Sequence, residues 1–215
     1  MRIGATVTTE RSAEILVLVN PDGERTMVAS SPTPDWSRLM LSTTAADVVF
    51  FEGWALFDSS IRNDYIRLIQ SAVKSGALVA VDVVSANRAD STQQHAELVA
   101  SLGADVIFAN AAEAEAYRFF DRVPAPLLYV HAGTKPTTVV HRGVATVVPV
   151  KAMPVIDSTG AGDTFAAGVL AGLAAGVSPL LSANLGHRAA RRVLNVVGGL
   201  LPKPATPRQS LGRAS

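Results

Sequence analysis

The sequence contains no cysteine and few aromatic residues. Without cysteine, the 215-residue chain can form neither disulfides nor thiolate metal sites. Its four histidines are scattered without the close spacing of metal ligands, so a histidine metal centre is not expected either. The formal net charge is only +1, which gives no electrostatic reason to expect a nucleic acid or an anionic membrane as a partner.

The N-terminus lacks an apolar signal core, and the one long uncharged stretch is interrupted. The first six residues, Met-Arg-Ile-Gly-Ala-Thr, contain no hydrophobic targeting segment, so we predict a cytoplasmic protein. Residues 164–186 carry no charge, and Gly168, Gly172 and Gly176 repeat at a spacing that also occurs where membrane helices meet. Pro179, preceded by a serine, is typical of the first turn of a new helix. The stretch before it is therefore too short to span a bilayer.

Hydrophobic residues make up 48% of the chain and charged residues 17%, which is typical of a globular domain with a full core. We expect one α/β domain over residues 1–201. Three prolines between positions 202 and 207 predict a disordered tail over residues 202–215.

Apolar runs alternate with amphipathic segments along most of the chain. Residues 15–19 and 26–29 flank an Asn-Pro-Asp-Gly turn and predict a β-hairpin. Strands are then expected at 48–51, 78–81, 105–108, 127–130, 138–140 and 146–148, and helices at 61–73, 91–102, 111–120 and 165–175. This alternation predicts a doubly wound, mainly parallel sheet flanked by helices.

Residues 157–163 read Asp-Ser-Thr-Gly-Ala-Gly-Asp and join a predicted strand to a predicted helix. The backbone amides of Gly160, Ala161 and Gly162 would be free to face a negative ligand, and glycine lets the main chain come close to it. Asp163 would lie beside that anion, which is unfavourable unless it accepts a proton from an attacking hydroxyl. Ligands of parallel sheets bind beyond the carboxyl ends of the strands, so the turn and Asn110 could share one cleft.

Residues 157–170, Asp-Ser-Thr-Gly-Ala-Gly-Asp-Thr-Phe-Ala-Ala-Gly-Val-Leu, resemble the second signature of the ribokinase/PfkB carbohydrate kinase family. Residues 110–113, Asn-Ala-Ala-Glu, resemble the Asn-x-x-Glu motif of that family, and the N-terminal hairpin resembles its mid-chain segment. The resemblance implies a ribokinase-like fold with the hairpin as part of a lid. It also implies transfer of the γ-phosphoryl of ATP to a hydroxyl of a sugar or nucleoside.

The resemblance implies a role for each matching residue at the catalytic end. Asp163 would be the base that deprotonates the acceptor, and the amides of Gly160, Ala161 and Gly162 would form the anion hole for the moving phosphoryl group. Glu52 lies where some relatives contact the sugar. A small-molecule sugar or nucleoside would therefore be the partner, and a homodimer formed through the lid is also implied.

On the nucleotide side, the resemblance implies that ATP is held by Asn110, Glu113, Gly133 and Thr159. Glu113 would help to bind Mg²⁺, mostly through water, and Asp157 would help to hold a monovalent cation such as K⁺.

Each of these sites also has a purely structural interpretation. The glycine turn could be a tight connection in which Asp163 only complements the helix dipole. Asn110 and Glu113 could form a helix capping box, and Glu52 could be a solvated loop acid. A dinucleotide-binding turn is not favoured, because position 165 is phenylalanine rather than glycine and no acid follows about twenty residues later.

Two departures from the family pattern define the main alternative. The hairpin that resembles the mid-chain of relatives lies near Met1, so about the first third of a typical member is expected to be missing and the sheet to be incomplete. The family's Thr-x-Gly-x-x-Gly loop reads His131-Ala-Gly133-Thr-Lys-Pro136, and proline removes a backbone donor. The competing hypothesis is therefore a catalytically silent, truncated relative that binds a nucleotide or a partner protein.

Overall fold

A computed structural model of the protein describes residues 14–19, 25–30, 46–84 and 92–198. The predicted turn of the N-terminal hairpin and the predicted tail at 202–215 lie outside these residues.

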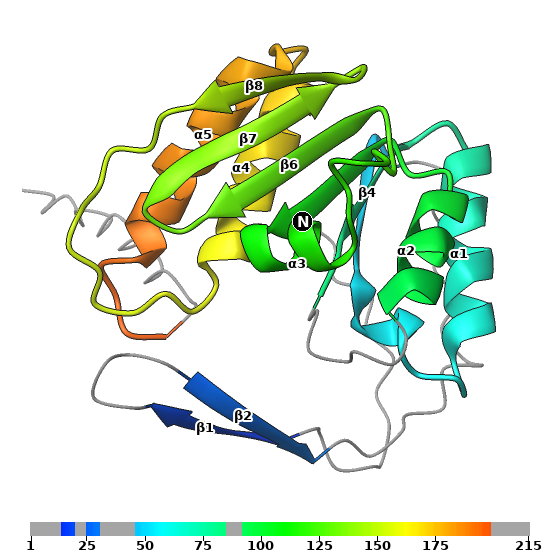
Figure 1. Cartoon of the computed structure of the whole chain (residues 1–215), viewed down its shortest axis with the longest axis horizontal. Coiled ribbons are helices and arrows are strands. Elements are labelled where there is room, and N and C mark those ends of the chain that lie inside the picture. The colour runs from blue at the N-terminus through cyan, green and yellow to red at the C-terminus, as the bar shows by residue number, and fades with distance from the viewer. Residues whose placement is uncertain (1–13, 20–24, 31–45, 85–91, 199–215) are drawn as a thin grey trace, which may run out of the picture.

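The strands form two separate sheets (Figure 1). Strands β1 (Glu14–Val19) and β2 (Arg25–Ser30) pair antiparallel, which confirms the predicted hairpin. The six-stranded main sheet follows chain order, with β3 (Val48–Glu52), β4 (Leu78–Asp82), β5 (Val106–Asn110), β6 (Leu127–Ala132), β7 (Lys135–His141) and β8 (Val144–Val148). Strands β3 to β6 are parallel, whereas β7 and β8 pair antiparallel. The predicted α/β fold is confirmed, with a mixed sheet.

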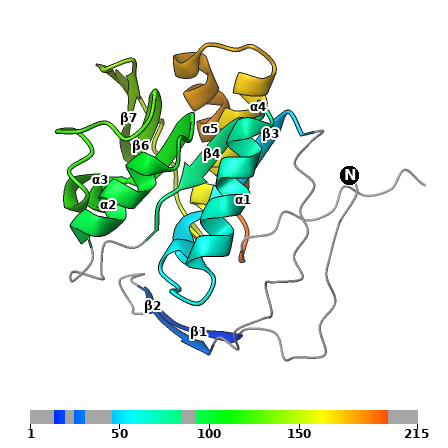
Figure 2. The ribbon, with the colours of Figure 1, turned by 90° about the vertical axis from the view of Figure 1, so that its right-hand side faces the viewer.

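Helices cover both faces of the main sheet (Figures 1 and 2). The helices α1 (Arg62–Lys74), α2 (Thr92–Ser101) and α3 (Ala111–Ala116) lie on one face, and α4 (Ala161–Ala174) and α5 (Pro179–Val193) lie on the other. Successive residues of the central strands point to opposite cores, so Ile107 packs on the first face and Phe108 on the second. Burial on both faces explains why the strands read as continuous apolar runs.

Glycines bring α4 and α5 into close contact. A Cβ atom added at Gly168 would lie 2.8 Å from the Cα atom of Gly186, and one at Gly172 would lie 2.7 Å from the hydroxyl of Ser182. Gly168 and Gly172 therefore act in packing between α4 and α5, whereas Gly176, with φ of 75°, follows the end of α4 and has no such close neighbour. None of the helices in the described ranges is long and apolar enough to cross a membrane.

Three boundaries differ from the prediction. Helix α4 begins at Ala161, four residues before the predicted start at Phe165. Helix α3 ends at Ala116 rather than at residue 120. The predicted nucleotide-side loop at 131–136 is a tight β-hairpin, because β6 extends to Ala132 and β7 begins at Lys135.

A short 3₁₀ helix, η2 (Gly53–Leu56), follows β3 and was not predicted. Gly53 is buried, and a Cβ atom there would lie 2.8 Å from the carbonyl oxygen of Asp82. The absence of a side chain at Gly53 thus lets the chain after β3 pack directly on the end of β4.

Candidate functional site

Three neighbouring parallel strands end in polar residues at the same edge of the main sheet. Glu52, Asp82 and Asn110 are the last residues of β3, β4 and β5, and Glu52 is paired in register with Asp82. Helix α4 begins near this edge (Figure 1). The topology therefore brings together residues that are separated by up to about a hundred positions in the chain, as expected for a ligand site of a parallel sheet.

The first turn of α4 leaves backbone donors unused. Gly160 is the N-cap residue and has a left-handed backbone with φ of 73°, a conformation that glycine adopts without strain. The amide of Ala161 donates to the carbonyl of Ser158 at 3.2 Å, so the turn itself uses this predicted anion-hole donor. The amides of Gly160 and Gly162 donate no hydrogen bond to any other described residue. These two N–H groups, at the positive end of the helix dipole, can donate hydrogen bonds to an anion.

Asp163 follows directly in this turn, and its side chain is exposed. The negative charge of Asp163 contributes to raising the pKa of both Glu52 and Asp82. The structure thus places the predicted base, Asp163, and the predicted sugar contact, Glu52, near the same edge of the main sheet.

Four carboxylates act on one another here, and we call Glu52, Asp82, Glu113 and Asp163 the acid cluster. Burial, followed by the charges of Glu113, Asp163 and Glu52, raises the pKa of Asp82 to about 8. Partial shielding from water and the charge of Asp163 also raise the pKa of Glu52. Such a concentration of negative charge favours binding of a cation or a proton. Within the described ranges, however, no three acidic or histidine side chains are placed to hold a metal ion directly.

Asp82 was not among the candidate site residues identified from the sequence. A signal for it existed, since it is the first polar residue after the apolar run 78–81, but its partners lie 30 or more positions away in the chain. Only the strand register shows that Asp82 and Glu52 are neighbours.

Asn110 and Glu113 form a reciprocal capping box at the start of α3. The Asn110 side chain accepts a hydrogen bond from the amide of Glu113 at 2.9 Å, and the Glu113 carboxylate accepts one from the amide of Asn110 at 2.8 Å. The structural interpretation of this motif is therefore correct. The cap also fixes the buried Glu113 carboxylate within the acid cluster, so a cap and a ligand site are compatible.

Asp157 and Thr159 stabilise the turn that precedes α4. One carboxylate oxygen of Asp157 accepts hydrogen bonds from the amide and the hydroxyl of Thr159, at 2.9 and 2.8 Å, and the other accepts one from the amide of Gly198 at 2.9 Å. These bonds connect the turn to the segment after α5. Both residues, predicted as ligand contacts, thus have a structural role that the sequence did not indicate.

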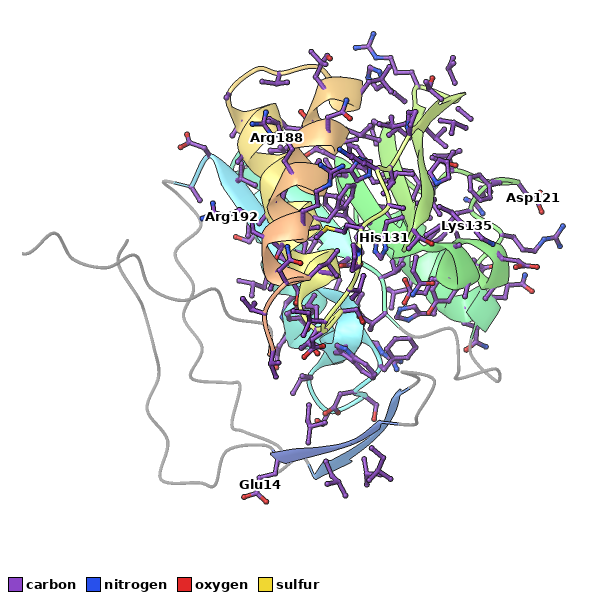
Figure 3. All side chains as sticks on the ribbon, turned by 90° about the vertical axis from the view of Figure 1, so that its left-hand side faces the viewer. Glu14, Asp121, His131, Lys135, Arg188 and Arg192 are labelled. Carbon is purple, nitrogen blue, oxygen red and sulfur yellow. The ribbon has the colours of Figure 1, made fainter. Side chains whose placement is uncertain are left out.

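The β6–β7 hairpin supplies the remaining predicted residue and one unpredicted neighbour of α4. Gly133 lies in the exposed two-residue turn with φ of 61° and is not part of the acid cluster. His131, at the end of β6, lies against the first turn of α4, since a Cβ atom at Gly162 would be 3.7 Å from its Nε2 atom. In Figure 3, His131 lies to one side of α5, and Arg188 and Arg192 of that helix lie to the other.

The fold agrees with the comparisons to known proteins. Residues 5–206 match the sequence profile described as pfkB family carbohydrate kinase. No curated protein sequence matches the chain closely enough to add a further relative.

Solved structures of kinases have a similar fold. An adenosine kinase from Sinorhizobium meliloti superposes with a TM-score of 0.74 at 25% identity, covering 87% of this chain and 62% of the other. A probable sugar kinase from Rhizobium etli CFN 42 gives 0.75 at 22% identity, with 87% and 61% covered. A double mutant of the fructokinase from Vibrio cholerae O395, bound to fructose, ADP and potassium ion, gives 0.68 at 20% identity, with 86% and 68% covered. The chain spans about three fifths of the first two structures.

Proposed function

The chain belongs to the pfkB family of carbohydrate kinases, and we propose that it transfers the γ-phosphoryl group of ATP to a hydroxyl of a sugar or nucleoside. The first turn of α4 carries this proposal. Its unengaged amides at Gly160 and Gly162 lie directly beside the exposed carboxylate of Asp163. Phosphoryl transfer needs a donor-rich place for the phosphate and a proton acceptor beside it, and this turn offers both.

We assign the role of general base to Asp163. Its carboxylate accepts the proton of the acceptor hydroxyl while the hydroxyl oxygen forms a bond to the γ-phosphorus. The bond from that phosphorus to the bridging oxygen breaks, and its electron pair leaves with ADP. The amides of Gly160 and Gly162 stabilise the charge on the transferred group during this step. The amide of Ala161 stabilises the turn by donating to the carbonyl of Ser158. It also stabilises the transferred group if its N–H is shared between that carbonyl and the phosphate.

The residues fit a nucleotide with Mg²⁺, which supplies the phosphoryl group and neutralises its negative charge. The acid cluster offers oxygen atoms, the ligands that Mg²⁺ prefers, and Asn110 lies beside its member Glu113 in the capping box of α3. Because no three described acids are placed for direct coordination, these carboxylates would hold the ion through its own water molecules. The fructokinase bound to ADP and potassium ion supports a nucleotide and a monovalent cation, for which Asp157 is our candidate. Gly133 and Thr159 would contribute further contacts on the nucleotide side.

Glu52 is our candidate for contact with the acceptor. It is exposed, it ends the strand next to Asp82, and its charge interacts with that of Asp163. A carboxylate in this place can accept hydrogen bonds from the hydroxyls of a sugar or of a nucleoside ribose.

The test is an ADP-release screen over sugars and nucleosides, run on the wild type, Asp163→Asn and the control Asp47→Asn. Asp47 is an exposed acid just before β3, at the opposite end of that strand. We expect Asp163→Asn to lower turnover by roughly 10²–10⁴-fold, the usual contribution of a general base, while ADP binding and the control variant stay near the wild type. Wild-type turnover in Asp163→Asn would show that Asp163 is not the base.

One observation favours a second candidate function. The chain covers only 62% of the adenosine kinase and 61% of the sugar kinase to which it is similar, so parts of those proteins have no counterpart in this sequence. If those parts are needed for turnover, the chain is a nucleotide-binding or protein-interaction module without catalytic activity. This second function predicts that the wild-type protein binds ADP but releases no ADP with any acceptor in the screen.

A further inference from the structure

Helix α1 holds the backbone at Glu52, our candidate for contact with the acceptor. Glu52 is the last residue of β3 and also the N-cap residue of η2, so it joins the sheet to this short helix. The hydroxyl of Tyr65, in the first turn of α1, donates a hydrogen bond to the carbonyl oxygen of Glu52 at 2.8 Å. Tyr65 therefore fixes the backbone at the point from which the Glu52 carboxylate projects.

The strand register explains why this carbonyl needs a partner outside the sheet. The amide of Leu78 in β4 donates to the carbonyl of Asp47 at 2.9 Å, and successive residues of a strand direct their backbone groups to alternate sides. Glu52, five positions after Asp47, thus directs its carbonyl away from β4. Within the described residues β3 is the outermost strand on that side of the main sheet, so the Tyr65 hydroxyl takes the place of a neighbouring strand.

The same helix also holds the other end of η2. The guanidinium group of Arg62 donates hydrogen bonds to the carbonyl oxygens of Leu56 and Phe57, at 2.6 and 3.3 Å. Leu56 is the last residue of η2 and Phe57 is its C-cap. Two side chains of α1 therefore determine where η2 begins and where it ends.

The Tyr65 ring is itself fixed, and its hydroxyl keeps its proton. The ring packs edge-on against that of Phe51, with 5.6 Å between the centroids, so the hydroxyl cannot leave Glu52 without a loss of packing. Burial, followed by the charge of Glu52, raises the pKa of Tyr65 to about 12. The hydroxyl is therefore a hydrogen-bond donor throughout the neutral pH range.

We propose, on the basis of the kinase function proposed above, that Tyr65 is a positioning residue that acts through Glu52 and sets the affinity for the acceptor. Tyr65 holds the carbonyl of Glu52, and the carboxylate of the same residue contacts a hydroxyl of the acceptor. When the Tyr65 hydroxyl is removed, the end of β3 loses this anchor and the carboxylate adopts orientations that do not meet the acceptor. Because bound substrate and transition state contact Glu52 alike, the loss falls on the KM of the acceptor rather than on kcat.

The chain contains a matched control, because all three of its tyrosines donate to a backbone carbonyl. Tyr129 donates to the carbonyl of Pro179 at 3.0 Å. Pro179 begins α5, beyond the end of α4 that is remote from Asp163. Tyr129→Phe therefore removes the same kind of hydrogen bond as Tyr65→Phe, but away from the acceptor contact.

The experiment is steady-state kinetics of the full chain with the acceptor found in the ADP-release screen. A neutral hydrogen bond contributes roughly 3- to 10-fold, so we expect Tyr65→Phe to raise the KM of the acceptor by that factor and to leave kcat and the KM of ATP within about twofold. Tyr129→Phe should leave all three parameters near the wild type. In the Glu52→Ala background, Tyr65→Phe should cause no further rise in the acceptor KM, because the contact through which it acts is gone.

Amide hydrogen exchange tests the anchoring of η2 without turnover. The amide of Phe57 donates to the carbonyl of Trp54 at 3.0 Å and closes η2. We expect this amide to exchange roughly 3- to 10-fold faster in Tyr65→Phe than in the wild type or in Tyr129→Phe. Thermal melting confirms that each variant is folded.

An unchanged acceptor KM in folded Tyr65→Phe would overturn the proposal, and so would an equal rise in the Glu52→Ala background. If Asp163→Asn loses turnover while Tyr65→Phe keeps the wild-type KM, the base assignment stands and only the positioning role fails. If the wild type releases no ADP with any acceptor, the kinase proposal fails, and the exchange rate of the Phe57 amide decides whether Tyr65 holds this junction. Unchanged exchange in Tyr65→Phe would then reject the role of Tyr65 as well.

Discussion

Gly160 and Gly162 belong to the same turn, but the fold requires only one of them to be glycine. Gly160 has φ of 73°, where other residues are strained by about 1 kcal/mol or more. Gly162 has ordinary helical geometry, and a Cβ atom there would meet the His131 ring at 3.7 Å, a normal van der Waals distance. The fold alone therefore does not explain the second glycine, whereas a ligand close to the backbone does.

The variant Gly162→Ala should separate binding from stability. We expect its free energy of unfolding to stay within about 1 kcal/mol of the wild type, because alanine is favoured over glycine in helices. Its methyl group would point toward His131, into the space assigned to phosphate, so the affinity for tripolyphosphate should fall at least roughly tenfold, the loss of one charged hydrogen bond. Thermal denaturation and titration calorimetry measure the two effects. Wild-type affinity in this variant would contradict the placement of the phosphate.

Candidate site residues could be identified in the sequence where they are contiguous. Asp163 and the glycines before it form one motif, so a role could be proposed for them from local order alone. Neither Asp82 nor His131 was among the candidate site residues, although the structure places both near that turn or its neighbours. Asp82 is brought to Glu52 by pairing of β3 with β4, and His131 is brought to Gly162 by packing of α4 on the sheet. Neither contact has a local signature.

At the scale of elements, the strands and the longer helices follow the prediction because a strand buried on both faces reads as an apolar run. The boundaries differ for local reasons. The first residues of α4 are small and carry no apolar period, so the helix start was placed four residues late. Helix α3 ends early, where Arg118 adopts a left-handed backbone with φ of 53° without a glycine to signal the stop. Pro136 suggested a loop, but it is accommodated within β7.

The contact between α4 and α5 gives a prediction about packing. Alanine at Gly168 would place its Cβ atom 2.8 Å from the Cα atom of Gly186 and from the carbonyl of Leu185, and these backbone atoms cannot move aside cheaply. We expect Gly168→Ala to destabilise the protein by about 2 kcal/mol, an overpacking cost that exceeds the gain in helix propensity. The midpoint of thermal unfolding should fall by roughly 4 to 8 °C.

Gly162→Ala is the matched control, since it is also a glycine-to-alanine change inside α4 but has room for the methyl group. Equal melting temperatures for the two variants would show that the helices can separate without cost, contrary to our description of this interface.

At the scale of the whole molecule, the buried His95 and the half-buried Asp82 act in opposite directions on stability. His95 is 5% exposed, its Nε2 atom has no partner among the described residues, and its ring stacks on Phe57. Burial, followed by the charge of Arg62, lowers the pKa of His95 to about 4, so its stabilising contribution is complete above pH 6.5 and is lost as the pH falls toward 4. The raised pKa of Asp82, about 8, has the opposite effect, since its contribution is complete below pH 3.8 and is lost as the pH rises toward 8.

The pH dependence of unfolding should therefore reveal both groups. Between pH 4 and 6.5 the two slopes, each about 1.4 kcal/mol per pH unit, oppose one another, and from pH 6.5 to 8 only the decline due to Asp82 remains. Urea unfolding of Asp82→Asn should show little loss between pH 6.5 and 8. His95→Leu should gain stability on acidification toward pH 4.5 relative to the wild type. If Asp82→Asn declines as steeply as the wild type above pH 6.5, the acid cluster is not coupled as we describe.

The overall architecture was predictable in its parallel half and less so beyond it. The three strands expected at 127–130, 138–140 and 146–148 follow one another closely in the sequence, and short connections favour antiparallel pairing, as β7 and β8 show. A lid function of the β1–β2 hairpin remains a prediction. In Figure 1 the hairpin lies apart from the main sheet, and it shares no strand pairing with that sheet.

The central claim is that the first turn of α4 holds a phosphate whose transfer Asp163 assists. It is tested most directly by following ATP and the acceptor found in the screen by ³¹P NMR, with the wild type and with Asp163→Asn. We predict that the wild type forms a phosphomonoester of the acceptor, and that Asp163→Asn binds ADP normally but forms the ester roughly 10²–10⁴-fold more slowly. Formation of the ester by Asp163→Asn at the wild-type rate, or release of only inorganic phosphate by the wild type, would contradict the account.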